Sequence, residues 1–305
     1  MKVLITGIDG FLGRHAQAYF SARGARIYGL GRPRQTGDAG QAVIRVQLGD
    51  DRLKDHEMPD VDAVIHLATP AHVHPQGDAD DWGKRLQRET IDGTAELINW
   101  IRPSNAKLVF ISSIKAKEVS SDDLGYAKAK SAAEHLALTY ENAAVLRLPI
   151  VVGPKMKGQL VKMIALAQKG VLPALPTSGD ARPLIDVRDV LSAIDALLRS
   201  DIPGAQKRVW EISDGHSYSL HDVSVAIRSV AGARNGVGSL LGPLVGMALA
   251  VRRAINIPAL SPKFMSYFDE KIVADTAAFS EAFDWHPAHD LRSALHDALY
   301  LGERD

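Results

Sequence analysis

The stretch "KVLITGIDGFLG", residues 2–13, decides the fold: a short apolar run leads into Gly7, Gly10 and Gly13, spaced G-x-x-G-x-x-G. The first glycine permits a tight turn, the second lets the backbone approach a pyrophosphate, and the third lets the following helix pack on the strand. The N–H groups and dipole at the start of that helix attract phosphate. Three spaced glycines are weak evidence alone, but these lie at the first strand–helix junction, which is the context that the motif requires. The stretch therefore predicts a dinucleotide-binding turn rather than a purely structural one.

The rest of the first half alternates apolar runs with helical patterns. Short runs rich in Val and Ile predict buried strands over residues 2–7, 26–31, 42–47, 62–68, 107–113 and 144–152. Between them, residues 11–24, 83–102 and 126–142 carry apolar side chains at helical spacing. This alternation predicts an α/β protein with a Rossmann-type doubly wound parallel sheet, covered by helices on both faces.

The pattern loosens after Pro154, which predicts a smaller C-terminal substrate lobe. We expect a dinucleotide-binding domain over residues 1–153, with later strand contributions near 184–200, and a mainly substrate-binding lobe over 154–305. The longest apolar stretch runs from Gly236 to Leu260, but Pro243, several glycines and two arginines interrupt it. We interpret it as a helix of the smaller lobe and not as a membrane span, which needs about 20 predominantly apolar residues.

Composition excludes several classes of function. The 305 residues hold 36 Lys plus Arg and 36 Asp plus Glu, so no global field favours nucleic acid or an anionic membrane as partner. The chain has no cysteine, which excludes disulfides, thiolate metal sites and a cysteine nucleophile. We expect no metal site, because His72 and His74 have no further ligand at suitable spacing. The N-terminus shows no signal-peptide pattern, so we expect a cytoplasmic protein without an integral membrane segment.

The end of the second predicted strand bears on the choice of cofactor. An acidic residue there hydrogen-bonds the ribose hydroxyls of NAD, whereas an arginine accommodates the extra phosphate of NADP. This chain has Gly31 followed by Arg32. The pattern favours NADP, and the alternative is a solvated basic turn with NAD bound.

Tyr126 and Lys130, in "YAKAK", lie four residues apart and therefore project from the same face of a helix. A phenol titrates at about 10, and a neighbouring ammonium together with a nicotinamide cation favours the phenolate. The pair is thus suited to general acid–base work, and Lys130 can also hold the cofactor ribose. Ser113 ends the preceding strand and can orient the reacting oxygen.

The alternative for this stretch is an ordinary amphipathic helix, because Tyr-x-x-x-Lys is a weak motif alone. Tyr267 and Lys271 match it as well. That second copy has no serine-ended strand before it, so we interpret only the first copy as catalytic.

Six motifs in order give the chain a family resemblance: "TGIDGFLG", "VIHLA", "VFISS", "YAKAK", "LRLPIVVGP" and "ARPLIDVRDV". Together with the closing "FDWHPAHDL", they resemble the extended short-chain dehydrogenases/reductases over essentially the whole chain. The most similar group is that of the nucleotide-sugar epimerases and 4-keto-sugar reductases, which serve bacterial surface-polysaccharide synthesis.

The resemblance implies roles for particular residues. Ser113, Tyr126 and Lys130 would be catalytic. The cofactor would be contacted by Gly7, Asp9, Gly10, Phe11, Leu12, Gly13, Arg32, Gln47, Leu48, Leu67, Ala68, Thr69, Thr90, Tyr126, Lys130, Pro149 and Ile150. The substrate would be contacted by Ile114, Lys115, Gln159, Leu160 and Arg182, with Arg182 on its diphosphate and the Gln159–Leu160 pair near its base. The alternative for Arg182 is an ion pair with Asp186 or Asp189.

The chain departs from the family pattern at three places. Tyr126 follows Ser113 by thirteen positions, which is a shorter spacing than usual for extended members and removes part of a loop beside the sugar pocket. Thr90 stands where the family usually has asparagine. The adenine-reading position is matched by Gln47–Leu48 in distance and by Asp50 in residue type.

The chemistry at the sugar follows from the residues after Ser113. Family members that dehydrate their substrate have Asp-Glu there, whereas this chain has Ile114 and Lys115, which disfavours dehydration. An NADPH-dependent 4-keto-sugar nucleotide reductase and a 4-epimerase with tightly bound NAD remain, and Gly31–Arg32 favours the reductase. A dinucleotide sensor without turnover is the alternative from another class, disfavoured by the intact triad. The helices over 83–102 and 126–142 carry apolar residues beyond one stripe, and the resemblance implies that these helices pair in a dimer, so we also expect a homodimer.

Overall fold

The structure is a computed structural model, and it describes residues 1–33, 42–70, 79–117, 125–175, 181–200, 208–232 and 272–301. The chain divides into two compact units. The first unit comprises Met1–Leu148, Leu191–Glu211 and Asp275–Trp285, and the second comprises Pro149–Val190, Ile212–Ala274 and His286–Asp305.

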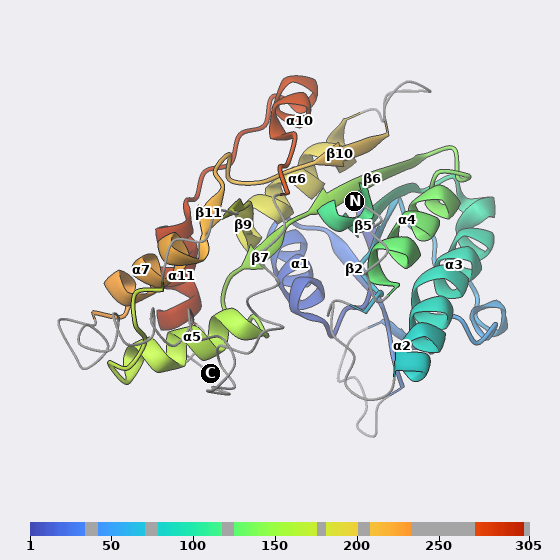
Figure 1. Cartoon of the computed structure of the whole chain (residues 1–305). Helices are drawn as coiled ribbons and strands as arrows, with labels where there is room; N and C mark the ends of the chain where they lie inside the picture. Colours follow the sequence, from blue (N-terminus) through green and yellow to red (C-terminus); the bar gives the residue numbers. More distant parts are fainter. Residues whose placement is uncertain are drawn as a thin grey trace. The chain divides into compact units, whose positions relative to one another are not determined.

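A seven-stranded sheet forms the centre of the first unit (Figure 1). Its strands are β1 (Lys2–Thr6), β2 (Arg26–Gly31), β3 (Val43–Arg45), β4 (Ala63–His66), β5 (Lys107–Ser113), β6 (Ala143–Leu148) and β10 (Val209–Glu211). All the pairings are parallel, in the order β10-β6-β5-β4-β1-β2-β3. The chain leaves β1 toward β2 on one side and later returns to β4 on the other, so the strand order reverses at β1. Ligands of such sheets bind beyond the carboxyl ends of the strands at this point.

The helices of this unit follow the predicted pattern, with one interruption. They are α1 (Phe11–Ala22), α2 (Ala79–Leu86), α3 (Gly93–Ile101), α4 (Tyr126–Ala137), α6 (Val187–Arg199, which begins in the second unit) and α10 (Thr276–Phe283). The single helix predicted over residues 83–102 is wrong in detail. A π-helical segment, η2 (Gln87–Asp92), separates α2 from α3. Such segments are rare and cannot be read from hydrophobic periodicity.

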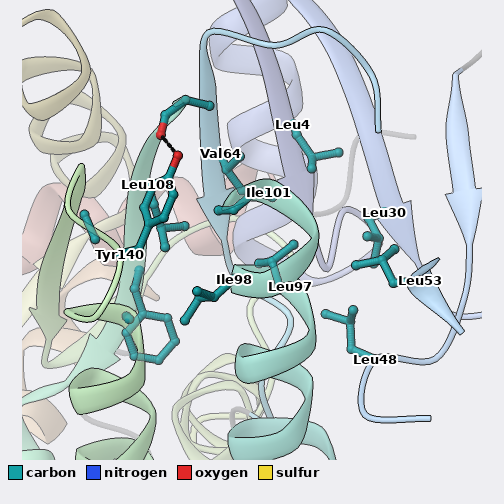
Figure 2. Packing of buried hydrophobic residues seen from close by; sticks show 14 of the residues in the cluster. Leu4, Leu30, Leu48, Leu53, Val64, Leu97, Ile98, Ile101, Leu108 and Tyr140 are labelled. Carbon is teal, nitrogen blue, oxygen red and sulfur yellow. Dashed lines mark hydrogen bonds between the residues drawn. The ribbon is translucent and has the colours of Figure 1, made fainter. Parts of the chain in front are cut away.

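The sheet is buried on both faces. On one face, Leu4, Val64 and Leu108 pack against Leu97 and Ile101 of α3 (Figure 2). Their neighbours along the strands point to the opposite face and are equally buried, namely Val3, Ile5, Ala63, Ile65 and Val109. The predicted Rossmann-type doubly wound sheet is therefore confirmed, and the continuous apolar runs of the sequence are explained by burial on both sides.

The second unit is smaller and contains two short two-stranded sheets. β7 (Ile150–Val152) pairs in parallel with β9 (Leu184–Asp186), and β8 (Ala181–Arg182) pairs antiparallel with β11 (Tyr218–Ser219). The helices in the described residues of this unit are α5 (Gln159–Gln168), α7 (Leu220–Val230) and α11 (Leu291–Tyr300). The strand predicted over 144–152 is thus two strands in two different sheets. The break falls at Pro149, which has no N–H for a sheet hydrogen bond.

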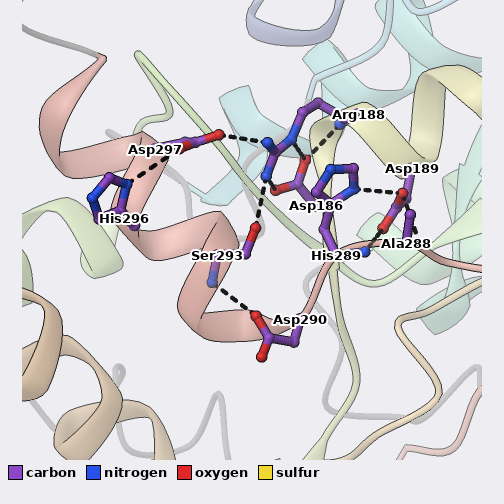
Figure 3. Close-up of polar contacts among 9 residues, drawn as sticks. All are labelled: Asp186, Arg188, Asp189, Ala288, His289, Asp290, Ser293, His296 and Asp297. Atoms are coloured by element: carbon purple, nitrogen blue, oxygen red, sulfur yellow. Dashed lines mark hydrogen bonds and ion pairs between the residues drawn. The ribbon is translucent and has the colours of Figure 1, made fainter.

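An ionic cluster ties the end of β9 to α11 within this unit (Figure 3). The Arg188 guanidinium donates to Asp186 Oδ2 at 2.7 Å and to Ser293 Oγ at 3.0 Å, and it lies 2.6 Å from Asp297 Oδ2. Asp186 is almost fully buried, so its charge needs this bidentate partner.

Asp189 makes a second connection in the same unit. Its carboxylate accepts the backbone N–H groups of Ala288 and His289 at 3.1 and 3.0 Å, and it lies 2.8 Å from His289 Nδ1. The "RDV" and "HPAHD" segments, about 100 residues apart, are joined in this way (Figure 3).

Two further expectations bear on the fold. The apolar stretch from Gly236 to Leu260 lies outside the described residues. Among the helices that the structure describes, none is long and apolar enough to cross a bilayer.

The assignment of cofactor binding to residues 1–153, with strand contributions near 184–200, and of substrate binding to 154–305 stays a prediction. The homodimer stays a prediction as well.

The third glycine of the turn should tolerate no side chain. A Cβ on Gly13 would lie 2.2 Å from the carbonyl oxygen of Gly7, whereas a Cβ on Gly83 in α2 would meet no atom within 4 Å. We expect Gly13→Ala to lower the free energy of unfolding by about 1 to 3 kcal/mol through overpacking. Gly83→Ala should leave it unchanged or raise it by up to about 1 kcal/mol through helix propensity. Urea denaturation of both variants measures this, and equal effects would contradict the close packing at Gly13.

Candidate active site

The glycine turn is built as the sequence predicts. Gly7 has a left-handed backbone, with φ of +64°, and its carbonyl accepts the N–H of Gly10 at 2.8 Å. A Cβ on Gly7 would lie 3.0 Å from Cα of Ala68, so the turn touches the chain just after β4. Gly10 precedes α1 and offers no side chain to cap it. The first-turn N–H groups of α1 are therefore suited to an anionic ligand.

A threonine joins the ends of β1 and β4 beneath this turn. Thr6 Oγ1 accepts the backbone N–H groups of Leu67 and Ala68 at 3.1 and 3.0 Å. It also lies 2.7 Å from Nδ1 of His66. All of these groups lie at the carboxyl edge of the sheet, so the position of Ala68 against Gly7 depends on the Thr6 hydroxyl.

His66 continues the hydrogen-bond chain to the π-helical segment. Its Nε2 lies 3.1 Å from Thr94 Oγ1, and Thr94 Oγ1 donates to the carbonyl of Thr90 at 2.5 Å. Because Thr94 gives its only proton to Thr90, it must accept from His66, so His66 carries its proton on Nε2 and accepts the Thr6 proton on Nδ1. His66 is thus a hydrogen-bonded core histidine: the ring is fully buried and both of its nitrogens have partners.

Burial, together with the nearby Lys130 ammonium, lowers the pKa of His66 to about 3. The ring is therefore neutral at physiological pH, in agreement with its hydrogen bonds.

Lys130 reaches the same edge of the sheet from α4. Its Nζ donates to Thr69 Oγ1 at 2.6 Å and to the carbonyl of Ile111 at 3.0 Å, and it lies 5.3 Å from the centre of the Phe110 ring. The side chain is 4% exposed. Burial lowers the pKa of Lys130 to about 7, although the carboxylate of Glu134 acts in the opposite direction. A buried ionisable group at the end of a parallel sheet is typical of a functional site.

Tyr126 is the first residue of α4. It follows Gly125, which is left-handed with φ of +87°, and it is 7% exposed. Its ring packs in a small cluster with Trp82 and Leu86 of α2 and with Ala129. Ser113 ends β5, and its Oγ accepts the N–H of Lys115 at 3.3 Å. The sheet and α4 thus supply the three predicted catalytic residues from one unit, and their convergence on a substrate oxygen stays a prediction.

The other predicted cofactor residues of the first unit differ in their surroundings. Asp9 lies in the glycine turn and forms an ion pair, which is described below. Arg32 is exposed, directly after β2. The side chain of Leu48 is 2% exposed and packs in the core, so only its backbone is available to a ligand. Thr90 is 1% exposed, and its hydroxyl has no hydrogen-bond partner among the described residues.

Five predicted site residues belong to the second unit. Pro149 and Ile150 begin it, Gln159 and Leu160 begin α5, and Arg182 ends β8. Arg182 is 3% exposed. Asp186 binds Arg188, and Asp189 binds residues 288–289. The substrate contact of Arg182 and its alternative, an ion pair with one of these aspartates, both stay predictions.

Sequence reasoning missed Thr6, Thr94 and Arg45. The sequence around the two threonines did not identify them as site residues, because a threonine at the end of a buried strand or inside a helix can have many structural roles. Arg45 lies in β3, opposite Gly31 in the parallel register, and only the strand pairing brings it to the glycine turn.

These features define a class of fold: a Rossmann-type doubly wound sheet with a glycine turn after β1 and with the predicted catalytic residues on β5 and α4. Residues 3–213 match the model of the NAD dependent epimerase/dehydratase family, and the chain belongs to that family. The resemblance to extended short-chain dehydrogenases/reductases of the nucleotide-sugar epimerase and reductase group is thereby confirmed. The protein is an enzyme of the oxidoreductase and epimerase kind.

Individual relatives are distant. The chain is 27% identical over 247 residues to the UDP-glucose 4-epimerase of Vibrio cholerae, with 73% of each chain covered. It is 26% identical over 263 residues to the GDP-6-deoxy-D-mannose reductase of Pseudomonas aeruginosa, with 75% of this chain and 80% of the relative covered. Among solved structures, the UDP-N-acetylglucosamine 4-epimerase from Bacillus cereus superposes with a TM-score of 0.74 at 19% identity, over 100% of both chains. That likeness shows the fold.

The buried neutral His66 should make the native protein sensitive to acid. The ring is neutral in the folded protein and titrates near its ordinary pKa when unfolded, so stability is lost as the pH falls from about 6.5 toward 3. Between pH 7 and pH 5 the native protein should lose about 2 kcal/mol more than His66→Gln. Urea denaturation at the two pH values measures this. His135→Gln, at an exposed position of α4, is the control and should retain the native pH dependence.

Proposed function

We propose that the protein is an NADPH-dependent 4-keto-sugar nucleotide reductase. The observation that carries the proposal is the placement of Lys130, whose Nζ binds Thr69 and Ile111 at the carboxyl edge of the sheet. Thr69 directly follows Ala68, which touches the glycine turn, so the lysine one helical turn from Tyr126 lies beside the expected dinucleotide site.

In the proposed mechanism each residue has a separate task. A bound nicotinamide dinucleotide supplies the hydride. The Tyr126 hydroxyl donates a proton to the oxygen at C4, and the Ser113 hydroxyl donates a hydrogen bond to the same oxygen. The Lys130 ammonium favours the tyrosinate that remains, because an opposite charge nearby stabilises the ionised phenol.

The residues after Ser113 support reduction over elimination. Ile114 is 5% exposed and apolar, and Lys115 is a cation, so neither supplies the carboxylate that dehydration needs. Arg32, directly after β2, and glycine at position 31 support NADP as the cofactor. The second candidate is a nucleotide-sugar 4-epimerase with retained NAD, which the likeness to the Vibrio cholerae epimerase favours. We further propose that Arg182 and the Gln159–Leu160 pair contact the substrate.

Tyr126→Phe should remove the proton donor while leaving the fold intact. We expect turnover of NADPH with the true 4-keto sugar to fall at least about hundredfold, with dinucleotide affinity changed less than about threefold. An assay of NADPH consumption measures turnover, and a binding titration measures the dinucleotide affinity. The control is Tyr140→Phe, which removes the hydroxyl that donates to the Ala106 carbonyl at 2.8 Å. It should cost about 1 kcal/mol of stability and keep turnover. Full activity in Tyr126→Phe would refute the mechanism.

The dinucleotide in the purified protein separates the two candidates. A reductase releases its cofactor after each turnover, so we expect an empty site and consumption of NADPH with a panel of UDP- and dTDP-4-keto sugars. Tightly held NAD, with interconversion of 4-epimers and no net consumption, would establish the epimerase instead. Release of bound nucleotide by denaturation, followed by chromatography, gives the first answer. Binding of a dinucleotide without turnover of any panel member would favour the sensor.

A further inference from the structure

Gly31 ends β2 and has no side chain, but side chains from other elements occupy the space beside it. A Cβ built on Gly31 would lie 2.4 Å from Arg45 Nη1 and 2.6 Å from Asp9 Oδ2. Two charged side chains from other elements therefore occupy the place of the side chain that glycine lacks. In NAD-binding sheets of this type, the acidic side chain that binds the ribose projects from about this position.

The two side chains form an ion pair. Arg45 Nη1 donates to Asp9 Oδ2 at 2.5 Å, and Nη2 donates to Oδ1 at 3.5 Å. Arg45 Nη1 also lies 3.4 Å from the carbonyl oxygen of Arg32. The side chains of Arg45 and Asp9 are 18% and 30% exposed, so the pair is shielded from water on most sides but open to a ligand.

Each partner is anchored independently of the other. Arg45 is the last residue of β3 and pairs with Gly31 in the sheet register. Asp9 belongs to the glycine turn, and its carbonyl accepts Arg14 Nη1 from α1 at 2.7 Å. The pair thus connects the turn that is expected to hold the pyrophosphate with the strand end that is expected to meet the adenosine ribose.

The two groups prefer opposite ligands. A carboxylate only accepts hydrogen bonds, which suits the 2′- and 3′-hydroxyls of NAD and repels a phosphate. A guanidinium only donates, and its planar fork suits the 2′-phosphate of NADP. We propose that the Asp9–Arg45 pair reads the 2′ position of the adenosine ribose, with Asp9 as the receptor for the hydroxyl and Arg45 as the receptor for the phosphate. This inference rests on the proposed dinucleotide binding.

Because the charges of Asp9 and Arg45 offset each other, we expect the native protein to discriminate only weakly between a 2′-hydroxyl and a 2′-phosphate. A 2′-phosphate that approaches Arg45 also meets the Asp9 carboxylate, so the attraction is largely offset. The chain keeps a modest preference for the phosphate through Arg32 and the missing acid at position 31. Removing one partner takes its charge out of the site, so the preference should shift toward the phosphate without Asp9 and toward the hydroxyl without Arg45.

Two nucleotide fragments test the proposal without any sugar substrate. Calorimetric titration with 2′,5′-ADP and with 5′-AMP gives a ratio of dissociation constants for the native protein, which we expect to lie within tenfold. Asp9→Asn should shift that ratio at least tenfold toward 2′,5′-ADP. Arg45→Met should shift it at least tenfold toward 5′-AMP, mainly by weakening 2′,5′-ADP. Arg45→Gln, which can still hydrogen-bond Asp9, should shift it in the same direction and serves if Arg45→Met folds poorly.

A matched ion pair at the opposite end of β1 supplies the control. Lys2 Nζ lies 2.5 Å from Asp60 Oδ2, at the amino end of the sheet. Lys2→Met and Asp60→Asn should leave the ratio of the two dissociation constants unchanged.

The outcomes separate this inference from the proposed function. If Asp9→Asn and the Arg45 variants weaken both fragments by the same factor, the pair is only structural and the inference is refuted while dinucleotide binding stands. If the native protein binds neither fragment, the proposed dinucleotide binding fails, and this inference fails with it.

Discussion

The structure depends on one close contact, between the glycine turn and the chain that follows β4. Gly7 packs so closely against Ala68 that a Cβ on Gly7 would lie 3.0 Å from Cα of Ala68. Thr6 Oγ1 accepts hydrogen bonds from the N–H groups of Leu67 and Ala68. This contact joins the two strands at which the strand order reverses, where sheets of this type bind their ligands. A larger residue at position 7 would push the strand ends apart and remove the surface on which a dinucleotide is expected to lie.

Two buried polar side chains near this contact, His66 and Lys130, are held in fixed positions at a cost in stability. His66 and Lys130 are both almost inaccessible, and burial shifts the pKa of each downward because a charge is poorly solvated there. His66 avoids a buried charge because its ring stays neutral, and both ring nitrogens are hydrogen-bonded. Lys130 keeps two oxygen acceptors, Thr69 Oγ1 and the Ile111 carbonyl, and gains from the charge of Glu134. Such an arrangement costs stability and is typical of residues retained for chemistry.

The π-helical segment extends the same network. Thr94 joins His66 to the carbonyl of Thr90, so the core histidine and the segment between α2 and α3 are held together by one directional chain of hydrogen bonds. π-Helical turns inside helices occur frequently at functional sites, where they displace one residue from the regular face. Thr90, at the position where the family usually has asparagine, lies in this segment, with a buried hydroxyl that has no partner in the described part of the chain. The π-helical segment therefore holds a buried polar group at this position although asparagine is absent.

The sequence by itself determined the strand–helix alternation of the first unit, the glycine turn, the Tyr126–Lys130 spacing and the family. These are local signals: the period of burial reports the element, and glycine spacing reports a turn. Only the tertiary structure decided that Arg45 and Asp9 meet above Gly31, that His66 protonates on Nε2, and that Pro149 separates two sheets. Each of these depends on residues that are distant in the sequence and adjacent in space, whereas the periodicity of a segment reports its own burial and not the identity of its neighbours.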